Sequence, residues 1–361
     1  MNNDLSDNLV EQITRAYGKK TPLVIISGGS KSFYGNVIEG TALNVKQHSG
    51  IIEYRPSELV LTARSGTKLS DIENELSKNN QMLAFEPPSH NRAATLGGSI
   101  ACGLSGPRRP FAGAARDFVL GTTIINGKGE LLKFGGQVMK NVAGYDASRL
   151  MVGAQGTLGV LIDISVKVLP KPESELTLCF DKPFDDAHRT LRNWIIQGQP
   201  ISASCYYEKR LFIRLSSTAN SVKQAHQTIG GDIQHDKNSD ELWKQLQHQD
   251  HKFFKHNNDD PRDLWRVSVP PATPAIATEC PQLTEWNGAL RWISSNEDMF
   301  ELARQFDGHA TRYTLNKKTG DDSTGDIFQT LPAGMLALHR RIKQSFDPAN
   351  ILNPGRIYNE L

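Results

Sequence analysis

The chain has 361 residues, with 41 Lys and Arg against 39 Asp and Glu and a hydrophobic content of 38%. These values are typical of an ordinary soluble globular protein that is long enough for two domains, and they disfavour intrinsic disorder. The formal net charge of +2 gives no global field that would attract nucleic acid or acidic lipid, so a nucleic-acid-binding function is disfavoured.

Short helical and strand patterns begin the chain. Ser6 is placed to cap a first helix, and Gly18 is placed to end it. The apolar run at 23–26 predicts a strand, and residues 50–66 predict two short strands around a turn. We therefore expect a strand-rich region with local helices.

A capping pattern and a glycine-rich stretch follow. Ser70 and Glu73 have the spacing of a capping box, which predicts a helix over 71–79. Residues 95–106, TLGGSIACGLSG, are too irregular for a long helix and too apolar for an exposed linker. We expect them to be buried backbone that wraps around something.

A hairpin and a further strand come next. Residues 118–135 predict a β-hairpin whose turn residues, Asn126 and Gly127, need positive φ. Another strand is expected at 158–169, and the prolines that follow it make a natural boundary.

Beyond this boundary the pattern changes. Short strand patterns alternate with amphipathic helices near 184–197, 219–229 and 296–305. An antiparallel sheet with helices on one face satisfies this pattern. Residues 316–326 are polar and predict a mobile loop, and Pro332 opens a last helix.

The glycine-rich turn after the first strand matches neither of two common phosphate-binding motifs. A P-loop requires a glycine five positions before a Lys-Ser pair, and here Lys31 follows Ser30 without such a glycine. The dinucleotide-binding pattern G-x-G-x-x-G is also absent. A nucleoside triphosphate and a Rossmann-type dinucleotide site are therefore both disfavoured.

Four glycine-rich segments are distributed along the first half of the chain. They are Gly28-Gly29 with Ser30 and Ser32, Gly97-Gly98 with Ser99, the stretch from Gly103 to Gly106, and residues 153–160. Any one of them alone is more simply explained as a tight turn. Together they indicate a long ligand with a central pyrophosphate, because backbone N–H groups in successive turns can form anion-binding nests.

The order of four longer segments resembles the flavoproteins of the vanillyl-alcohol oxidase type, whose FAD-binding domain is shared with p-cresol methylhydroxylase. The segments are SGGSKSFYG, FEPPSHNRAATLGGSIACGLSGPRR, KNVAGYDASRLMVGAQGTLGVL and FDPANILNPGRIY. The likeness is specific from 86 to 170 and weak from 172 to 330. Within the family it is strongest to FAD-binding subunits of bacterial glycolate oxidase complexes.

The resemblance implies an α+β fold. It implies a p-cresol methylhydroxylase-type FAD-binding domain of two α+β subdomains, and a smaller cap-like α+β domain with an antiparallel sheet. The expected boundaries are 1–171 for the FAD-binding domain and 172–330 for a reduced cap or substrate-like domain. Residues 331–361 are expected to form a C-terminal helix and tail that return to the FAD domain.

The resemblance also implies FAD as the cofactor. Residues 28–32 would bind the pyrophosphate, 97–99 and 103–106 would line the isoalloxazine and ribityl side, and Gly159 with Val160 would meet the adenosine end. Four further residues would lie near the flavin or only brace the domain: Lys140, Asn141, Tyr145 and Asp146. The full set of expected cofactor-binding residues is Ser27, Gly28, Gly29, Ser30, Lys31, Ser32, Pro88, Leu96, Gly97, Gly98, Ser99, Gly103, Ser105, Gly106, Gly153, Gln155, Gly156, Gly159 and Val160.

The mode of attachment is expected to be noncovalent. Many relatives attach FAD through a histidine in the first glycine-rich loop, whereas here that loop carries Ser30, Lys31 and Ser32. His48 and His90 are expected to be surface or hydrogen-bonded structural residues rather than flavin ligands.

No catalytic residue is assigned. Catalytic 2-hydroxy-acid oxidoreductases of the family carry an H.G.GN.H motif and a later Glu-His pair, and neither occurs between 172 and 330. Oxidation of such an acid requires a base at the hydroxyl and a cation at the carboxylate. Arg291, Arg312 and Arg356 could bind a carboxylate, but arginine on a strand or tail is usually a salt-bridge partner, which is the preferred interpretation.

Three functions follow from these patterns. The first is an FAD-binding subunit of a complex that oxidises glycolate, a small 2-hydroxy acid, to glyoxylate. It would act in electron relay or assembly beside a catalytic sister flavoprotein and an iron–sulfur subunit. The second is a self-sufficient FAD-dependent 2-hydroxy-acid oxidoreductase. The third is a scaffold that has lost FAD, which the retained glycines disfavour because glycine is entropically costly.

The distribution of cysteines and apolar residues bears on cofactors and location. The four cysteines form no C-x-x-C pair, which disfavours an iron–sulfur cluster or structural zinc in this chain. His248, His251 and His256 do not share one helical face, so a solvated polar segment is preferred to a metal site. The first residues do not resemble a signal peptide and no stretch reaches the roughly 20 apolar residues of a membrane span. We expect a cytoplasmic protein that reaches the inner membrane only through partners.

Overall fold

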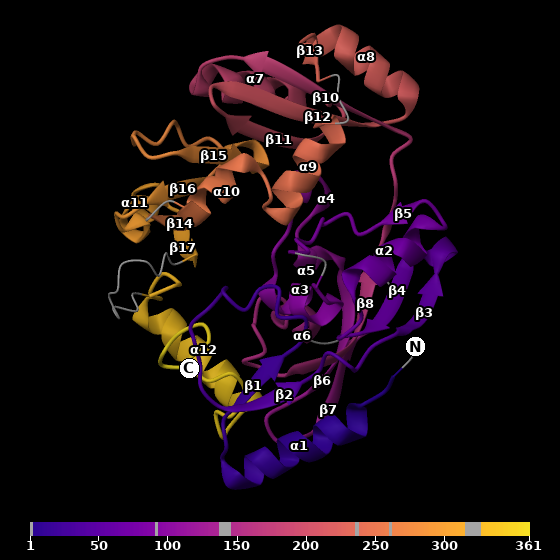
Figure 1. The fold of residues 1–361 in the computed structure, drawn as a ribbon, viewed down its shortest axis with the longest axis vertical. Helices are drawn as coiled ribbons and strands as arrows, with labels where there is room; N and C mark the ends of the chain where they lie inside the picture. The colour runs from indigo at the N-terminus through magenta and orange to yellow at the C-terminus, as the bar shows by residue number, and fades with distance from the viewer. Residues whose placement is uncertain (1–2, 91–92, 137–145, 235–237, 260–261, 315–325) are drawn as a thin grey trace. The chain divides into compact units, whose positions relative to one another are not determined.

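The computed structural model describes residues 3–90, 93–136, 146–234, 238–259, 262–314 and 326–361. Lys140, Asn141 and Tyr145 lie outside the described residues, as does nearly all of the polar stretch 316–326. The chain forms two compact units (Figure 1). Unit 1 comprises Met1–Leu104, Gly113–Pro170 and Thr330–Leu361, and unit 2 comprises Ser105–Ala112 and Lys171–Gln329.

The main sheet of unit 1 is antiparallel and has five strands in the order β3-β4-β8-β6-β7. Its strands are β3 (Ile51–Arg55), β4 (Val60–Arg64), β6 (Val119–Ile125), β7 (Leu131–Gly135) and β8 (Val160–Lys167). Two smaller pairs are β1 (Leu23–Ile26) with β2 (Thr41–Asn44), and β5 (Gln81–Met82) with β9 (Leu169–Pro170). The strands predicted in this half of the chain are confirmed.

Helices surround these strands. They are α1 (Ser6–Lys19), the 3-10 turn η1 (Pro56–Glu58), α2 (Leu69–Ser77), α3 (Leu96–Cys102), α5 (Ala115–Phe118), α6 (Ala147–Leu150) and α12 (Ala333–Phe346). The stretch predicted to be irregular buried backbone thus contains a short helix, α3, with Gly103 in the left-handed region as its C-cap.

The ends of the first two helices differ from the prediction. The N-cap of α1 is Leu5, because the hydroxyl and N–H of Ser6 both bond to Asp4 Oδ1. Its C-cap is Lys20, not Gly18. In α2 no side chain caps the N-terminus, since the bridge between Lys68 and Thr95 starts the helix before Ser70 can act.

The turn of the hairpin between β6 and β7 also differs. Its residue with positive φ is Gly129, at +83°, and neither Asn126 nor Gly127 has positive φ. The side chain of Asn126 instead shapes the turn, because Oδ1 accepts hydrogen bonds from the N–H groups of Lys128 at 2.9 Å and Glu130 at 3.0 Å. Gly127 packs so closely against Asp347 that a Cβ atom would not fit.

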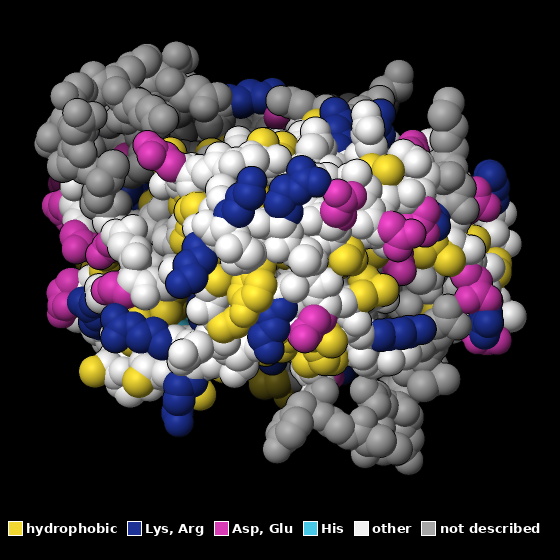
Figure 2. Space-filling model, turned by 90° about the horizontal axis from the view of Figure 1, so that it is seen from below, with side chains coloured by type: hydrophobic (Ala, Val, Ile, Leu, Met, Phe, Trp, Pro, Cys, Tyr) yellow, Lys and Arg dark blue, Asp and Glu magenta, His cyan; other side chains and the backbone are white. Residues whose placement is uncertain are grey.

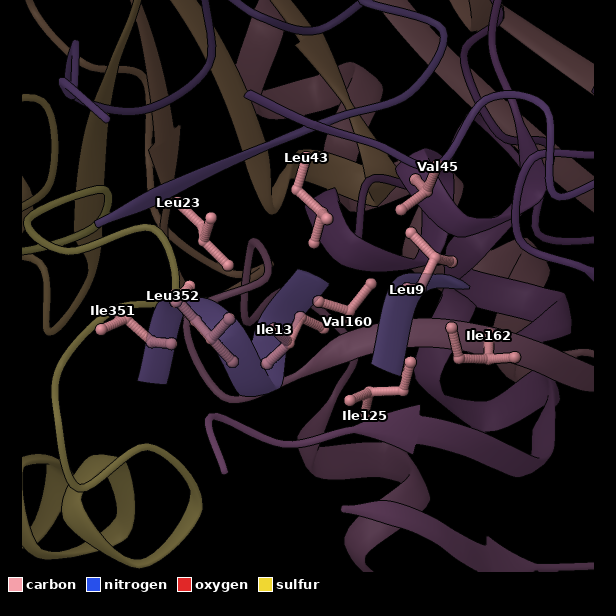
Figure 3. Packing of buried hydrophobic residues seen from close by; sticks show 11 residues of the cluster. Leu9, Ile13, Leu23, Leu43, Val45, Ile125, Val160, Ile162, Ile351 and Leu352 are labelled. Carbon is pink, nitrogen blue, oxygen red and sulfur yellow. The ribbon is translucent and has the colours of Figure 1, made fainter. Parts of the chain in front are cut away.

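The core beneath β1 and β2 joins segments that are far apart in sequence (Figure 3). Its labelled side chains come from α1, β1, β2 and the residue after it, the end of β6, β8 and the C-terminal tail: Leu9, Ile13, Leu23, Leu43, Val45, Ile125, Val160, Ile162, Ile351 and Leu352. The N–H of Leu23 donates to the carbonyl of Ile351 at 2.7 Å. The tail, drawn in yellow in Figure 1, therefore extends the β1 edge of unit 1.

Unit 2 is built on an antiparallel sheet of eight strands in the order β13-β10-β12-β11-β15-β16-β14-β17. The strands are β10 (Ser174–Asp181), β11 (Ile201–Tyr207), β12 (Arg210–Ser217), β13 (Asp232–Ile233), β14 (Asp263–Ser268), β15 (Gln282–Glu285), β16 (Leu290–Ser295) and β17 (His309–Thr314). The helices are α4 (Arg109–Ala112), α7 (Phe184–Ile196), α8 (Ala219–Ile229), α9 (Asn238–His248), α10 (Lys252–Asp259), α11 (Met299–Gln305) and the turn η2 (Trp286–Gly288).

Helices lie on both faces of this sheet, so the prediction of helices on one face is wrong. Leu178 of β10 packs in a core with Leu191 of α7 and Val222 of α8. Thr177, its neighbour on β10, points to the other face and accepts a hydrogen bond from the indole of Trp243 on α9 at 2.9 Å. Adjacent strand residues therefore separate α7 and α8 from α9.

The segment around His251 packs into the interior of unit 2, so the prediction of a solvated polar segment is wrong there. His251 is buried, its ring packs edge-to-face on Tyr207 at 5.1 Å, and burial lowers the pKa of its imidazole to about 4. Phe253 and Phe254 are buried beside it. Within the described residues, no group of three or more His, Cys, Asp or Glu side chains could hold a metal ion.

The surface carries charges of both signs. On the face drawn in Figure 2, Lys and Arg side chains are interspersed with Asp and Glu, as the small net charge requires. Among the helices that the structure describes, none has both the length and the apolar character needed to span a bilayer.

Candidate functional site

A cavity of about 360 Å³ opens in unit 1 beside the end of β1. Its walls come from β1 and the turn after it, from α3, from the turn that precedes β8, and from the C-terminal tail. These walls are distant in sequence but contiguous in the fold, since the tail pairs with β1.

The turn after β1 forms the first wall. Gly28 lies so close to the carbonyl oxygen of Ala93 that no side chain fits there. Gly29 has a φ of +70°, in the left-handed region that glycine adopts without strain, and apart from its two chain neighbours no described residue has an atom within 4 Å of where its Cβ would be. The N–H of Ser32 closes the turn on the Gly29 carbonyl at 3.2 Å. The turn therefore presents backbone to the cavity at Gly29.

The N-terminal turn of α3 forms a second wall. Its N–H groups already have protein acceptors, since Gly97 donates to the Ser65 carbonyl at 2.8 Å and Gly98 to Thr95 Oγ1 at 3.2 Å. A Cβ at Gly97 would lie 2.5 Å from Ser65 Cβ. These glycines allow close packing and supply surface to the cavity rather than hydrogen-bond donors.

Lys31 brings a buried positive charge to the cavity. Its side chain is 6% exposed, and its ammonium group donates to the Pro88 carbonyl at 3.1 Å and to Ser30 Oγ at 3.3 Å. Burial lowers the pKa of Lys31, and the thiol of Cys102 partly opposes that shift. Among the described residues it has no carboxylate partner, so its charge is available to a bound anion.

Arg356 brings a second positive charge from the tail. Its guanidinium donates to Gln155 Oε1 at 3.2 Å and to the carbonyls of Asn36 at 2.6 Å, Ser32 at 2.8 Å and Tyr34 at 2.7 Å. Burial lowers its pKa as well. In the part of the chain that the structure describes, Arg356 has only neutral partners, contrary to the preferred interpretation as a salt-bridge residue.

The turn before β8 completes the cavity. A Cβ at Gly159 would lie 2.6 Å from Ile124 Cδ1. The chain that leads into β8 can therefore lie this close to β6 only because residue 159 has no side chain. Asn353 links this turn to β1, because its Nδ2 donates to the Gln155 carbonyl at 2.6 Å while its Oδ1 accepts from the N–H of Ile25 at 2.8 Å.

Twelve of the expected residues line this cavity and seven do not. Those that line it are Ser27, Gly28, Gly29, Ser30, Lys31, Ser32, Gly97, Gly98, Gln155, Gly156, Gly159 and Val160. Those that do not are Pro88, Leu96, Ser99, Gly103, Ser105, Gly106 and Gly153. Gly103 and Gly153 pack against each other, because a Cβ on Gly103 would lie 3.1 Å from Gly153 Cα. Ser105 and Gly106 belong to unit 2.

Twelve lining residues were not predicted from the sequence. They are Val24, Ile25, Ile26, Ile38, Val45, Ser65, Thr95, Ala101, Cys102, Leu161, Asn353 and Arg356. Most are apolar or small residues of strands and helices, and such residues do not indicate a ligand-binding site from the sequence alone. Asn353 and Arg356 lie in the segment NPGR, whose Pro-Gly pair predicts only a turn.

The other residues that the sequence indicated have structural partners. Asp146 caps α6 by accepting from the N–H of Arg149 at 3.2 Å. His48 is buried and accepts from the N–H of Leu5 at 3.0 Å, and the ring of His90 packs on Phe33.

The remaining two candidate arginines lie in unit 2. Arg312 is paired with Asp263 at 3.4 Å, as the salt-bridge interpretation predicts. Arg291 is fully buried, stacks on Phe184 at 4.4 Å and donates to the Thr273 carbonyl at 2.9 Å. Burial lowers the Arg291 pKa to about 10.

Comparison with known families defines the class of protein. Residues 6–135 match the FAD binding domain family, and residues 327–357 match the C-terminal domain of FAD linked oxidases. The chain is 45% identical over 361 residues to glycolate oxidase subunit GlcE of Escherichia coli (strain K12), covering 99% of both chains. The chain therefore belongs to the GlcE family of FAD-linked oxidoreductases.

More distant relatives match mainly one part of the chain. It is 33% identical over 161 residues to a D-lactate dehydrogenase of Anaerostipes hadrus, covering 45% of this chain and 32% of the relative. It is 35% identical over 140 residues to glycolate oxidase subunit GlcD of Bacillus subtilis (strain 168), covering 38% and 29%.

Solved structures confirm the predicted fold class. The structure of p-cresol methylhydroxylase with substrate bound matches with a TM-score of 0.69 and 15% identity, over 97% of this chain and 87% of that one. Alkyldihydroxyacetonephosphate synthase matches with a TM-score of 0.65 and 15% identity, over 96% and 75%.

The chemistry of the cavity suits FAD. Its volume falls in the range of small-molecule sites, about 300–1,000 Å³. Two positive charges with neutral partners, Lys31 and Arg356, suit a pyrophosphate, and Gly29 leaves the backbone beside them open. The apolar lining from β1 and β8 suits the aromatic parts of the cofactor.

Proposed function

We propose that this chain is the FAD-binding subunit of a glycolate oxidase complex that converts glycolate to glyoxylate. The observation that carries the proposal is the 45% identity to glycolate oxidase subunit GlcE over 99% of both chains. When bound, FAD supplies the capacity to accept a hydride equivalent and pass its electrons onward. The chain's own contribution is to bind and orient that cofactor.

The cavity of unit 1 is our proposed FAD site. Lys31 and Arg356 would neutralise the pyrophosphate, and the open backbone at Gly29 would let it approach closely. The apolar side chains of β1 and β8 would exclude water from the rings. We retain residues 1–171 and 331–361 as the FAD-binding domain and 172–330 as a reduced cap domain.

We further propose that FAD is bound noncovalently. No histidine is found among the described residues that line the cavity. Cys102 lines it, but burial raises the pKa of its thiol, which disfavours the nucleophilic thiolate. Acid precipitation should therefore release the flavin into solution.

The partners in this proposal are a catalytic sister flavoprotein and an iron–sulfur subunit. The match of 140 residues of this chain to glycolate oxidase subunit GlcD of Bacillus subtilis supports two related flavoproteins in one system. The complex would be cytoplasmic and would reach the inner membrane only through partners.

A single substitution in the cavity tests the proposed site. Lys31→Met should weaken FAD binding about 10- to 100-fold, because a charge-assisted interaction of about 1.5–3 kcal/mol is lost. The measurement is the dissociation constant for FAD of flavin-depleted full-length protein, followed by flavin fluorescence. Lys19→Met, at an exposed lysine of α1, is the control and should leave the constant unchanged.

Two results would contradict the proposal. If Lys31→Met and Lys19→Met bound FAD equally well, the cavity would not be the pyrophosphate site. If protein purified from cells carried no flavin and bound none on titration, the scaffold hypothesis would replace the proposed function.

A further inference from the structure

A second cavity, of about 270 Å³, opens in unit 2 between one face of α7 and the loop that follows β14. Its polar lining from α7 consists of Asp185, His188, Arg189 and Arg192. These residues are three or four positions apart, so their side chains share one face of the helix. The loop contributes residues 272–274 to the opposite wall.

Two hydrogen bonds hold the walls of this cavity together. Asp185 Oδ1 accepts from the N–H of Ala275 at 3.3 Å, and the guanidinium of Arg291 on β16 donates to the Thr273 carbonyl at 2.9 Å. Arg291 also stacks on the ring of Phe184 at 4.4 Å, so it contacts both the helix and the loop. The two walls are therefore fixed relative to each other.

His188 brings a hydrogen-bond acceptor to the cavity. Its side chain is 4% exposed, and Nδ1 donates to the Phe184 carbonyl at 2.9 Å, since a carbonyl oxygen can only accept. Burial lowers the pKa of the imidazole to about 4, so the ring is neutral at pH 7. Nε2 is then unprotonated, and it has no hydrogen-bond partner in the part of the chain that the structure describes.

The surroundings of His188 hold its ring in place. The ring stacks on that of Phe184, with the two centroids 4.0 Å apart. A Cβ at Gly288 would lie 3.0 Å from Cδ2 of the imidazole, so only glycine at this position leaves the ring its space. The imidazole is therefore fixed where it lines the cavity.

Among the residues that the structure describes, one cation at this cavity has no anionic partner. Arg189 is paired with Asp186 at 3.1 Å, and the carboxylate of Asp185 stabilises the charged form of the buried Arg291. Arg192 is half-buried, and no described carboxylate pairs with it. The cavity therefore suits a ligand that carries one negative charge.

Arg192 and His188 are close enough to contact one small molecule. They are four positions apart on α7, a spacing that places Cβ atoms about 5–6 Å from each other. The charge of Arg192 is also near enough to contribute to the lowered pKa of His188. A carboxylate bound by the guanidinium thus has its neighbouring carbon within reach of the imidazole.

We propose that Arg192 and His188 form a binding site for a small hydroxy acid with one negative charge in this cavity of unit 2. The guanidinium of Arg192 binds the carboxylate, whose planar geometry it matches. Nε2 of His188 accepts a hydrogen bond from the hydroxyl group beside that carboxylate. This ligand is additional to the cofactor of unit 1, and its site depends on residues of unit 2 alone.

Calorimetric titration of glycolate, a small acid of this class, into the FAD-loaded, full-length protein tests the site. Arg192→Gln should weaken glycolate binding about 10- to 100-fold, because a charge-assisted hydrogen bond is lost. Acetate, which has no hydroxyl group, should bind about 3- to 10-fold less tightly than glycolate to the unsubstituted protein. In His188→Leu the two acids should bind with equal affinity, because the acceptor of the hydroxyl group is gone.

Arg304→Gln is the matched control. It removes an exposed helical arginine of unit 2 that pairs with Glu301 at 3.1 Å and does not line the cavity, so glycolate affinity should not change.

Two further ligands test the chemical class. Glycine has nearly the size of glycolate, but an ammonium group replaces the hydroxyl group and leaves no net charge, so it should bind less tightly. Inorganic phosphate should also bind less tightly, because it lacks the planar carboxylate. Binding of either one as tightly as glycolate would overturn the assignment to hydroxy acids.

The outcomes separate this inference from the proposed function. If the protein carries flavin but binds no glycolate, or if Arg192→Gln binds it as tightly as the unsubstituted protein, the site in unit 2 is refuted and the FAD subunit stands. If the protein lacks flavin but its glycolate binding is sensitive to Arg192→Gln, only the proposed function fails.

Discussion

Individual glycines around the cavity lack a side chain for different reasons. Gly28 and Gly97 are required because protein atoms occupy the position of a Cβ, whereas at Gly29 that position is open. The sequence identified all three through one pattern of small residues. It could not separate them, because the neighbours that fill the Cβ positions, such as Ser65 and Ala93, are distant in sequence.

Arg356 illustrates a contribution that composition cannot reveal. Its partners are backbone carbonyls and an amide oxygen, and the residues that carry them lie 201 to 324 positions earlier in the chain. An arginine in a C-terminal segment is ordinarily expected to pair with an acid. Only the folded path of residues 32–36 shows that this guanidinium has neutral partners.

His188 makes the stability of unit 2 dependent on pH. Its side chain is 4% exposed, burial lowers the pKa of its imidazole to about 4, and Nδ1 bonds to the Phe184 carbonyl at 2.9 Å. In the unfolded chain the imidazole has its ordinary pKa of about 6.5, whereas in the folded protein it takes up a proton only near pH 4. The free energy of unfolding therefore decreases as pH falls from about 6.5 to 4. The loss attributable to His188 should be on the order of 3 kcal/mol at pH 4.

Urea unfolding between pH 7 and pH 4 measures this effect. In His188→Leu the free energy of unfolding should fall by about 3 kcal/mol less between pH 7 and pH 4 than in the unsubstituted protein. The remaining fall is due to His251, whose pKa burial also lowers to about 4. A midpoint that falls as steeply in His188→Leu as in the unsubstituted protein would show that another group causes the acid sensitivity.

At the scale of elements, α12 is held at its C-terminal end. Lys343 is the one buried residue among the described side chains of that helix, whereas Met335 and Leu338 are exposed. Its ammonium donates to Asp347 Oδ2 at 2.7 Å and to the carbonyls of Thr157 and Leu352, each at 2.8 Å. Asp347 in turn accepts from the N–H of Leu352 at 2.7 Å. This pair fixes the tail that carries Asn353 and Arg356.

Lys343→Met should destabilise unit 1 by about 3–5 kcal/mol, because it leaves the buried carboxylate of Asp347 without its cation. Flavin content should fall with it, since the tail that lines the cavity loses its anchor. Thermal unfolding and the ratio of flavin to protein absorbance measure the two effects. Arg340→Met, at an exposed position of the same helix, should change neither, and equal behaviour of the two variants would refute the anchoring role.

Strands were easier to predict than helix ends and polar helices. The apolar runs of β1, β6 and β8 specify strands from local periodicity alone. The start of α2 depends on a bridge between Lys68 and Thr95, which is 27 residues later, so local capping signals mislead. The segment of α9 and α10 is mostly polar, and its few anchors, Trp243, Phe253 and Phe254, show their role only against the sheet.

At the scale of the whole molecule, the sequence was most informative about family and cofactor, and less so about the second unit. The predicted α+β fold and FAD are supported by the family and structural matches. In unit 2 the ring of Trp286 packs against Arg109 of α4 and Arg266 of β14, whose guanidinium carbons lie 4.3 Å and 5.0 Å from the ring centroid. No local motif encodes such a grouping, because its members are far apart in sequence.

The division of labour in the proposed complex has a spectroscopic consequence. Glycolate added anaerobically to the isolated chain should leave the flavin oxidised, and addition of the sister flavoprotein should bleach it, because electrons would arrive from the catalytic subunit. Absorbance of the flavin recorded before and after each addition measures this. Bleaching of the isolated chain by glycolate would favour the self-sufficient oxidoreductase instead.

The pairing of β1 with the tail imposes an order on biosynthesis. Ile25 is translated early, yet the residue that holds it, Asn353, is 328 positions further along. A nascent chain still attached to the ribosome before Arg356 has emerged cannot close the cavity. The cavity therefore cannot take up the cofactor until residues 353–356 have left the ribosome and paired with β1.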